Sequence, residues 1–517
     1  MSNPPHAQPG SDAQGGARTG TTAHYHLVIV GTDLSGLIAG ALAAKAGYRV
    51  CVIGQGSQGA MVEVRGQWLC RAPQMTYGLS SPPVRRVFDA LGLGLELRNL
   101  PQRKEPGFQV VMPGRRVDVT TQPDRFRAEL DREFPGERER IERFFRRVAE
   151  VDKQIEDTLD QGIRLPPTGI MENFKFRSLV KRFPFLDDEW AVPDPLADFP
   201  HGHPFRAFVH APFRFCSDML PARAYPASFV HVINELRKGI LTLDAGPDAL
   251  RNLFLGIIAA GGDVRPRAAV GRIEVRRGRA HSLLLRDRRS VIGCDAVLCN
   301  TDPKRFFALI PPEQQREEVH HAIHLLQPVF HTFTGVFVVK ARAIPEAMAR
   351  HVFVVADPAQ PLEEHNLVFL SRDIEAGTRR PERDMRTLTA VMRVPISAAT
   401  GGPTHARRLL DVLQARVETV VPFLAEHLVA RWTPWLRPAS ALAQSGEELD
   451  PLELRPAYGE AVPHTLGLSP VATGTSYRNI LVGSDAAFCG LGTDGPYVAA
   501  LQLVSELRDL VAVKSGF

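Results

Sequence analysis

Apolar positions near the start of the chain follow the order strand, helix, strand. Residues 27–30 form a β-branched run that ends at Gly31, small apolar residues then recur at helical spacing up to Gly47, and residues 50–53 form a second apolar run. Strand, glycine turn, helix and strand within about 30 residues are typical of the βαβ unit that binds a dinucleotide pyrophosphate. The pattern therefore predicts such a unit over residues 26–55.

The later hydrophobic pattern predicts a hairpin, charged helices, a return to the first domain and a second sheet. Apolar alternation around Pro113-Gly114 predicts the hairpin, and interleaved acids and bases over 123–161 predict solvated helices. A helix at 248–260 and a strand meander over 269–300 predict the return to the first domain. Four segments predict strands of a largely antiparallel sheet, and a helix is predicted to cover it: 329–339, 352–355, 367–370, 386–394 and the helix 405–429. The closing stretch 479–511 predicts a strand at 480–482, a glycine-rich turn and a long amphipathic helix.

Residues 164–226 differ from the rest because prolines, phenylalanines and basic residues crowd together. Such a segment can line an apolar substrate tunnel, or it can rest on lipid headgroups as a peripheral membrane contact. It can equally be an irregular cap packed on the core. The sequence leaves these readings open.

Composition narrows the class of protein. With 517 residues, 44% hydrophobic and 23% charged, the chain can bury a large core. The six cysteines form no CxxC pair, no apolar run reaches the length of a membrane span, and no signal segment begins the chain. We expect a cytoplasmic protein without a transmembrane segment, in which 164–226 is the candidate membrane contact. The net charge of +5 does not gather on one strip, so no nucleic-acid partner is expected.

Three separated stretches resemble the phytoene desaturase family, in the wider group that includes carotenoid isomerases, retinol saturases and flavin amine oxidases. They are the βαβ unit, the block AGPDALRNLFLGIIAAGGDVRPRAAVGRIEV with CDAVLCNTDPKRF, and RNILVGSDAAFCGLGTDGPYVAALQL. The resemblance implies an α/β fold with a discontinuous, Rossmann-like FAD/NAD(P)-binding domain and an inserted α+β substrate domain. We expect a disordered tail (1–24), FAD-binding parts (25–122, 241–310 and 466–517), a helical and aromatic cap (123–240) and a substrate domain (311–465).

The resemblance also implies a set of cofactor-binding residues. Gly31, Gly36 and Gly40 match the phosphate turn and the helix that follows it, and Val270 matches the strand residue whose backbone contacts adenine in relatives. Gly483 and Asp485 match the end of the last strand, and the loop under the flavin ring is matched by Gly490, Gly492 and Gly495. His464 lies in the loop before the closing strand, where relatives hold substrate, although a structural role is favoured for it. No catalytic acid or base is identified.

Several residues at the cofactor contacts depart from the family pattern. Asp33 replaces the middle glycine of the turn, where it adds bulk and negative charge, and its alternative role is that of helix N-cap. Gly54 stands where relatives carry the ribose-binding acid, with Gln55 beside it as a weaker contact, and Met61 replaces an arginine. The departures leave both retention and loss of FAD open. If they weaken binding, Asp33→Gly combined with Gly54→Glu should raise FAD affinity.

The sequence therefore predicts an FAD-dependent oxidoreductase of desaturase, saturase or isomerase type that transfers hydride between flavin and an apolar, isoprenoid-like substrate. The alternative is a cofactor-deficient relative that acts as a binding or partner protein. No metal site is predicted, because His320 and His324, one helical turn apart, have no third ligand at suitable spacing.

Overall fold

The computed structural model describes residues 23–512 with internal gaps. The gaps are 57–58, 65–66, 72, 74, 100, 163, 165–166, 168–169, 185–193, 218–225, 244–245, 373–383, 438–447, 451–452, 455, 461–472, 484–487 and 489. Two predicted site residues, Asp485 and His464, and nearly all of the predicted tail therefore lie outside the described residues. The first strand begins at Ala23, two residues inside that tail.

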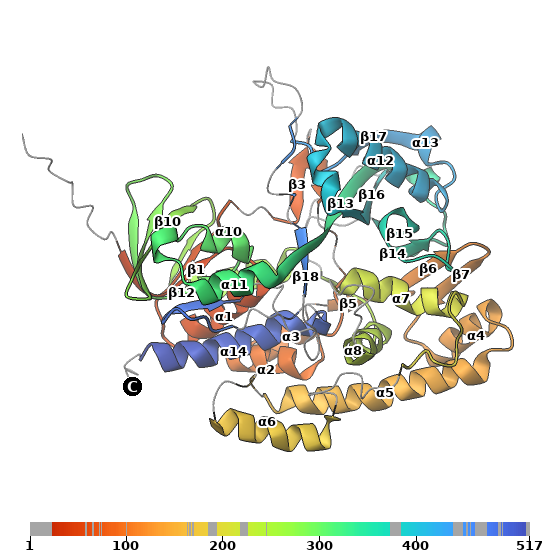
Figure 1. The fold of residues 1–517 in the computed structure, drawn as a ribbon. Helices are drawn as coiled ribbons and strands as arrows, with labels where there is room; N and C mark the ends of the chain where they lie inside the picture. Colours follow the sequence, from red (N-terminus) through yellow and green to blue (C-terminus); the bar gives the residue numbers. More distant parts are fainter. Residues whose placement is uncertain are drawn as a thin grey trace, which may run out of the picture.

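The first sheet is a parallel core with an antiparallel extension (Figure 1). Strands β9, β2, β1, β12 and β19 run parallel in that spatial order, and β10 and β11 continue from β12 as an antiparallel meander. The strands are β1 (Ala23–Val30), β2 (Val50–Ile53), β9 (Asp263–Arg265), β10 (Val270–Arg276), β11 (Arg279–Leu285), β12 (Val291–Cys299) and β19 (Ile480–Val482).

Different elements cover the two faces of this sheet, and successive side chains of β1 point to opposite faces. Leu27 and Ile29 pack toward the helical layer, whereas Val28 and Val30 pack toward the meander. The helical layer contains α1 (Leu34–Lys45), α2 (Pro82–Leu91), α9 (Ala249–Ala259) and α14 (Asp494–Leu510), and α10 (Pro303–Phe307) lies on the other side. At Gly40 a Cβ would lie 2.5 Å from the end of the Ile29 side chain, so glycine there favours close packing of α1 on β1.

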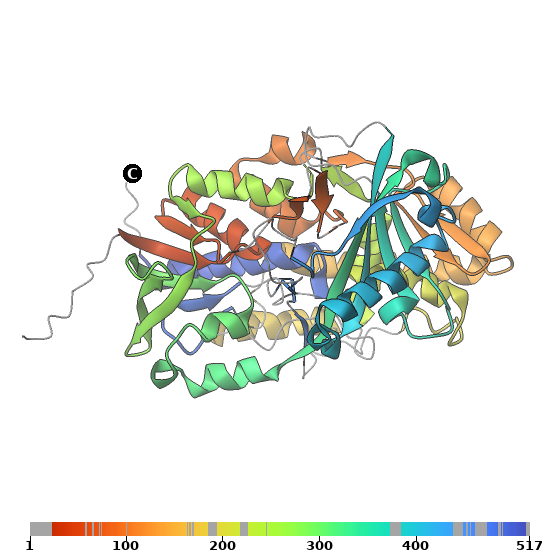
Figure 2. The same ribbon diagram turned by 90° about the horizontal axis from the view of Figure 1, so that it is seen from above.

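The second sheet has the order β17-β13-β16-β15-β14-β6-β7, with β18 paired to β13, and lies beside the first (Figure 2). Its strands are β6 (Phe108–Met112), β7 (Arg115–Val119), β13 (Leu326–Lys340), β14 (His351–Val355), β15 (Leu367–Arg372), β16 (Met385–Pro395), β17 (Leu428–Trp432) and β18 (Pro456–Glu460). The hairpin β6–β7 was expected within the first domain. It instead pairs with β14, where Phe108 packs edge-on against Phe353.

Helices cover both faces of the second sheet. One face packs against α12 (Gly402–Glu418), and the other faces α4 (Pro123–Glu133), α5 (Arg138–Asp160), α7 (Pro204–Cys216) and α8 (Pro226–Arg237). The remaining elements are β3 (Met61–Val64), β4 (Gln67–Cys70), α3 (Gly94–Asn99), β5 (Pro101–Arg103), α6 (Ile170–Arg182), β8 (Leu241–Leu243), α11 (Glu317–Leu325) and α13 (Leu424–His427).

The aromatic side chains of residues 164–226 lie in two kinds of surroundings. Phe199, Phe205, Phe208 and Phe213 are at most 4% exposed and form part of the core between the helices and the second sheet, whereas Phe174 on α6 is 73% exposed. Most of the described aromatics thus form a packed cap, and α6 remains as the exposed part. No helix among the described residues is long and apolar enough to cross a membrane.

Candidate functional site

In the first sheet, β1 lies between β2 and β12, so the spatial order of the strands reverses between β1 and β12. In open α/β sheets, ligands bind outside the carboxyl ends of the strands at such a switch point. Four strands end there at small or polar residues: Gly31 after β1, Gly54 after β2, Asn300 after β12 and Gly483 after β19. This edge is the candidate site.

Gly31 forms the tight turn from β1 into α1. Its φ is +109°, and a Cβ there would lie 2.0 Å from the carbonyl oxygen of Asn300. Its N–H donates to the carbonyl of Ile53 at 2.8 Å, which ties the turn to the end of β2. Only glycine fits this backbone. The turn has the geometry of a phosphate loop, and phosphate contact at Gly31 stays a prediction.

Asn300 caps the N-terminus of α1. Its side chain is fully buried, accepts the N–H of Gly36 at 2.9 Å and donates to the carbonyl oxygen of Asp33 at 2.8 Å. A Cβ on Gly36 would lie 2.2 Å from the Asn300 side chain, which explains the glycine. Asp33 occupies the N-cap position, but its side chain makes no capping hydrogen bond. The capping role considered for the Asp33 carboxylate is therefore wrong, because Asn300 fills it.

The adenosine end of the site is occupied by the chain itself. The two residues expected to contact adenosine, Gln55 and Val270, bind each other: the N–H of Val270 donates to Gln55 Oε1 at 2.6 Å, and Gln55 Nε2 lies 3.4 Å from the carbonyl oxygen of Val270. Gln55 adopts a left-handed backbone, with φ of +56°. A nucleotide base would have to displace this amide to reach the Val270 backbone.

Gly54 has no room for a side chain. A Cβ at this position would lie 2.1 Å from the carbonyl oxygen of Pro266, which is backbone and cannot rotate away. An acid at this position would push β2 and the segment after β9 apart. Gly54→Glu is therefore not expected to raise FAD affinity, because Pro266 occupies the space that the new side chain needs.

The flavin end of the site depends on close packing around the start of α14. At Gly492, φ is +53° and a Cβ would lie 2.4 Å from the Tyr77 hydroxyl, and at Gly495 it would lie 2.4 Å from the carbonyl oxygen of Phe488. Gly490 is buried in the same loop, and Gly483 packs against Leu503 of α14. These glycines let the positive N-terminus of α14 lie close to the sheet, as an anionic ring would require.

The turn that precedes β3 also departs from the family pattern. The N–H of Ala60 donates to both carboxylate oxygens of Asp248, at 3.0 and 2.9 Å. Met61 follows as the first residue of β3. The resemblance implies an arginine beside phosphate at this turn, but the turn binds the carboxylate of Asp248 instead. Taken together, the glycine turn at Gly31 and the start of α14 fit a dinucleotide cofactor, whereas the adenosine end and this turn fit it poorly.

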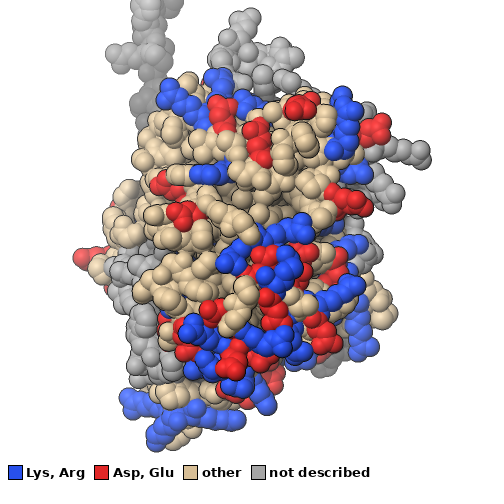
Figure 3. Space-filling model, turned by 90° about the vertical axis from the view of Figure 1, so that its right-hand side faces the viewer, with Lys and Arg blue, Asp and Glu red and all other residues tan. Residues whose placement is uncertain are grey.

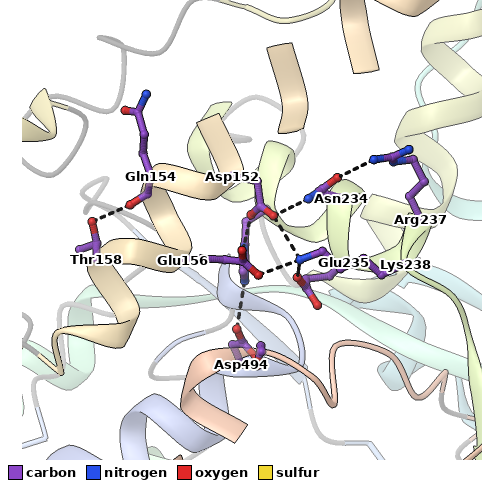
Figure 4. A network of polar contacts seen from close by, with 11 residues as sticks. Asp152, Gln154, Glu156, Thr158, Asn234, Glu235, Arg237, Lys238 and Asp494 are labelled. Carbon is purple, nitrogen blue, oxygen red and sulfur yellow. Dashed lines mark hydrogen bonds and ion pairs between the residues drawn. The ribbon is translucent and has the colours of Figure 1, made fainter. Parts of the chain in front are cut away.

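Behind the start of α14 lies a buried network of charged groups that the sequence analysis missed (Figure 4). His231 of α8 lies between two carboxylates: its Nδ1 is 2.7 Å from Asp152 of α5, and its Nε2 is 3.3 Å from Asp494 of α14. All three side chains are at most 1% exposed. Asn234 donates to Asp152 at 2.5 Å, and Ser81 donates to Asp494 at 2.5 Å.

The network carries a buried positive charge on His231. Burial opposes the charged imidazolium, but hydrogen bonding and the charges of Asp152 and Asp494 outweigh it and raise the pKa of His231 to about 10. Burial raises the pKa of Glu235, whose carboxylate is also ion-paired with Lys238. Among the described residues, Asp152, His231 and Glu235 are the one group of potential metal ligands close enough to share an ion. The Lys238 ammonium, 3.5 Å from Asp152 and 2.7 Å from Glu156, already supplies the cation.

A signal for this network is present in the helix pattern. Asp152 falls on the buried stripe of α5 together with Val148, Ile155 and Leu159, and His231 falls inside the apolar run of α8. A charged residue on an otherwise apolar helical stripe indicates a buried partner. His320 and His324, the histidines that sequence analysis did single out, contact each other on α11 with ring centroids 4.5 Å apart.

The network predicts a fall in stability at alkaline pH. Because folding raises the pKa of His231, its contribution is fully present below about pH 6.5 and is lost as the pH rises toward about 10. We expect the free energy of unfolding, measured by urea titration across this range, to decrease by several kcal/mol, since each pKa unit corresponds to about 1.4 kcal/mol. A His231→Leu variant should show a much flatter dependence, and an equally steep one would assign the effect to other groups.

The second sheet carries a small pocket of about 60 Å³ on the face toward α7. Phe215 stacks on Phe369 with ring centroids 3.9 Å apart, and Leu367 and Met392 complete an apolar wall. Arg214 and Arg393 border it, and the Arg393 guanidinium lies 4.0 Å above the ring of Phe330. Glu364 also lines the pocket, so its rim carries charges of both signs around the apolar wall.

Comparison with known proteins identifies the fold. No family model matches the chain, and no curated protein matches it by sequence. Among solved structures, an oxidoreductase from Methanosarcina mazei is similar over 93% of this chain and 99% of its own, with a TM-score of 0.59 and 14% identity. Wild-type putrescine oxidase bound to putrescine matches over 94% and 99%, with a TM-score of 0.54 and 16% identity.

Cyclohexylamine oxidase from Brevibacterium oxydans matches over the same shares of the two chains, with a TM-score of 0.53 and 12% identity. The likeness extends over nearly the whole chain in all three cases. It confirms the predicted α/β class with a Rossmann-like dinucleotide-binding fold. The chain thus has the fold of amine oxidase-type flavin oxidoreductases.

Proposed function

We propose that this chain is an FAD-dependent oxidoreductase that acts on an apolar, isoprenoid-like substrate. The observation that carries the proposal is the switch point between β1 and β12, where the Gly31 turn and the N-terminus of α1 meet at the carboxyl edge of the sheet. The whole-chain likeness to oxidoreductases of this fold supports it. When bound, FAD would supply the hydride acceptor or donor.

The chain's own residues would position the reaction. The N-termini of α1 and α14 favour negative charge at the pyrophosphate and the flavin ring. Phe215 and Phe369 form an apolar wall that excludes water, and Arg214, Arg393 and Glu364 place charges of both signs at its rim. The apolar wall favours an apolar substrate, and with it the desaturase, saturase or isomerase type.

The experiment is the absorption spectrum of the purified full chain, before and after incubation with FAD. We expect substoichiometric flavin that rises when FAD is added, because Gln55 competes for the adenosine end. Anaerobic reduction of the bound flavin by an apolar polyene, but not by putrescine, would support the substrate class. Flavin reduction by putrescine alone would contradict it.

A second candidate function is that of a cofactor-deficient binding or partner protein. The Gln55–Val270 pairing and the contact of Gly54 with Pro266 favour it specifically, since both place groups of the chain where a nucleotide would lie. Absence of flavin after FAD supplementation, in the wild type and in a Gln55→Ala variant alike, would support this candidate and contradict the first.

The Gln55→Ala variant is itself a prediction. Removing the amide frees the Val270 N–H and carbonyl. Two hydrogen bonds no longer in competition contribute about 1 kcal/mol each, so FAD affinity should rise about thirty-fold. Isothermal titration calorimetry measures the change. Gln327→Ala, which removes an exposed glutamine bonded to the carbonyl of His324, is the matched control and should leave affinity unchanged. A weaker affinity for Gln55→Ala would mean that Gln55 contacts the cofactor.

A further inference from the structure

The helix α6 exposes an unusual amount of apolar surface. Ile170, Met171 and Phe174 are 94%, 70% and 73% exposed, and only Leu179 of the whole helix is buried. Positions 170 and 174 are one turn apart, and 171 and 174 are three apart, so the three side chains form one continuous patch. In Figure 1 this helix lies at the outer edge of the molecule, below α2 and α14.

Basic side chains follow this patch along the same helix. Lys175, Arg177, Lys181 and Arg182 are all exposed, whereas Glu172, the acid of α6, lies 3.4 Å from Arg164. Basic groups gather at the lower edge of the molecule in Figure 3, where α6 lies, whereas acids and bases are interleaved over the rest of that face. The exposed face of α6 is thus apolar at its start and cationic toward its end.

A groove of about 630 Å³ separates α6 from α1, α2, α5 and α14. Its charged lining consists of five basic residues and one acid, Glu172: the basic residues are Lys45, Arg86, Arg164, Lys175 and Arg508. Apolar side chains, among them Leu42, Leu159 and Leu501, complete its wall. Arg164 is ion-paired with Glu172, Glu506 and Asp509, so Lys45, Arg86, Lys175 and Arg508 are the basic residues that give the groove its positive charge.

We propose that α6 and this groove dock the protein on the surface of a membrane that contains anionic phospholipid. Ile170, Met171 and Phe174 enter the boundary between headgroups and acyl chains, while the cations of α6 and the groove attract headgroup phosphates. This arrangement of apolar and basic residues on one helix is typical of interfacial binding. The proposal does not depend on whether the chain binds FAD.

Vesicle flotation of the full chain tests the docking. We expect binding to vesicles of phosphatidylcholine with phosphatidylglycerol, at least about ten-fold weaker binding to phosphatidylcholine alone, and release at about 1 M salt, where the screening length falls to about 3 Å. Equal binding to both vesicle types, or binding to neither, would overturn the proposal.

Variants separate the two parts of the surface. Ile170→Ser, Met171→Ser and Phe174→Ser together should abolish flotation, and Lys175→Glu with Lys181→Glu should weaken it at least about ten-fold. Val412→Ser with Phe423→Ser, at exposed apolar positions outside α6, is the matched control and should bind like the wild type. All the variants should keep the wild-type unfolding temperature. Flotation of the triple variant would overturn the proposal. A wild-type protein that is oligomeric without lipid, while the triple variant is monomeric, would overturn it as well and would assign the patch to contact between copies of the chain.

Discussion

Replacing His231 by leucine is expected to lower the free energy of unfolding by about 3–5 kcal/mol, because it leaves two buried carboxylates without their shared cation. Asp152 and Asp494 flank the ring at 2.7 and 3.3 Å, and both are at most 1% exposed. They belong to α5 and α14, so the loss should also loosen the contact between the cap helices and the flavin-end helix. Urea unfolding at neutral pH measures the effect.

The surface pair of the same residue types is the control. His24 lies 2.9 Å from Asp295, but its side chain is 54% exposed, and exposed pairs contribute at most about 1 kcal/mol. His24→Leu should therefore change the free energy of unfolding by less than about 1 kcal/mol. Combining His231→Leu with Asp152→Asn should recover part of the loss. A His231→Leu loss as small as that of His24→Leu would mean that the network is not buried as described.

The strands could be predicted from the sequence because their signals are local. The β-branched run at 27–30 lies within β1, and the apolar segments at 329–339 and 386–394 correspond to β13 and β16 with ends shifted by a few residues. Such runs predict buried strands whatever their partners are. The glycine at position 31 could be predicted for the same reason, since the turn it makes joins adjacent elements.

What could not be predicted is which distant groups meet. The hairpin β6–β7 has the same local pattern whether it joins the first sheet or the second, and only its pairing with β14 decides. Gln55 and Val270 are 215 positions apart, and Asn300 and Gly36 are 264 apart. No periodicity relates such pairs. The assignment of Gln55, Val270 and Gly36 to a cofactor by resemblance therefore missed the hydrogen bonds that these residues make within the chain.

These pairings change the meaning of the residues that depart from the family pattern. Asp33 does not cap α1, because Asn300 supplies the capping hydrogen bonds. The stronger obstacle lies at the other end of the nucleotide, where the Gln55 side chain covers Val270 and the Pro266 carbonyl covers Gly54. A side chain can rotate away, whereas a backbone carbonyl cannot. We therefore expect Gln55 to weaken cofactor binding only until its side chain rotates away, whereas the Pro266 carbonyl leaves no room for a ribose-binding acid at position 54.

Gly54→Ala is expected to lower the free energy of unfolding by about 3 kcal/mol, at the upper end of the cost of overpacking, since its Cβ would lie 2.1 Å from the carbonyl oxygen of Pro266. Gly54→Glu should cost at least as much and should lower FAD affinity, although it restores the acid that relatives carry. Urea unfolding and FAD titration of the two variants measure both effects.

Gly256→Ala supplies the matched control, because that glycine lies within α9 with no atom within 4 Å of a new Cβ. The same substitution there should raise the free energy of unfolding by about 0.5–1 kcal/mol, since alanine favours helix. A destabilised Gly54→Ala beside a stabilised Gly256→Ala would locate the cost in the contact with Pro266. If Gly54→Glu instead raised FAD affinity without loss of stability, the segment after β9 would have to move aside, and the adenosine end would be open to a nucleotide after all.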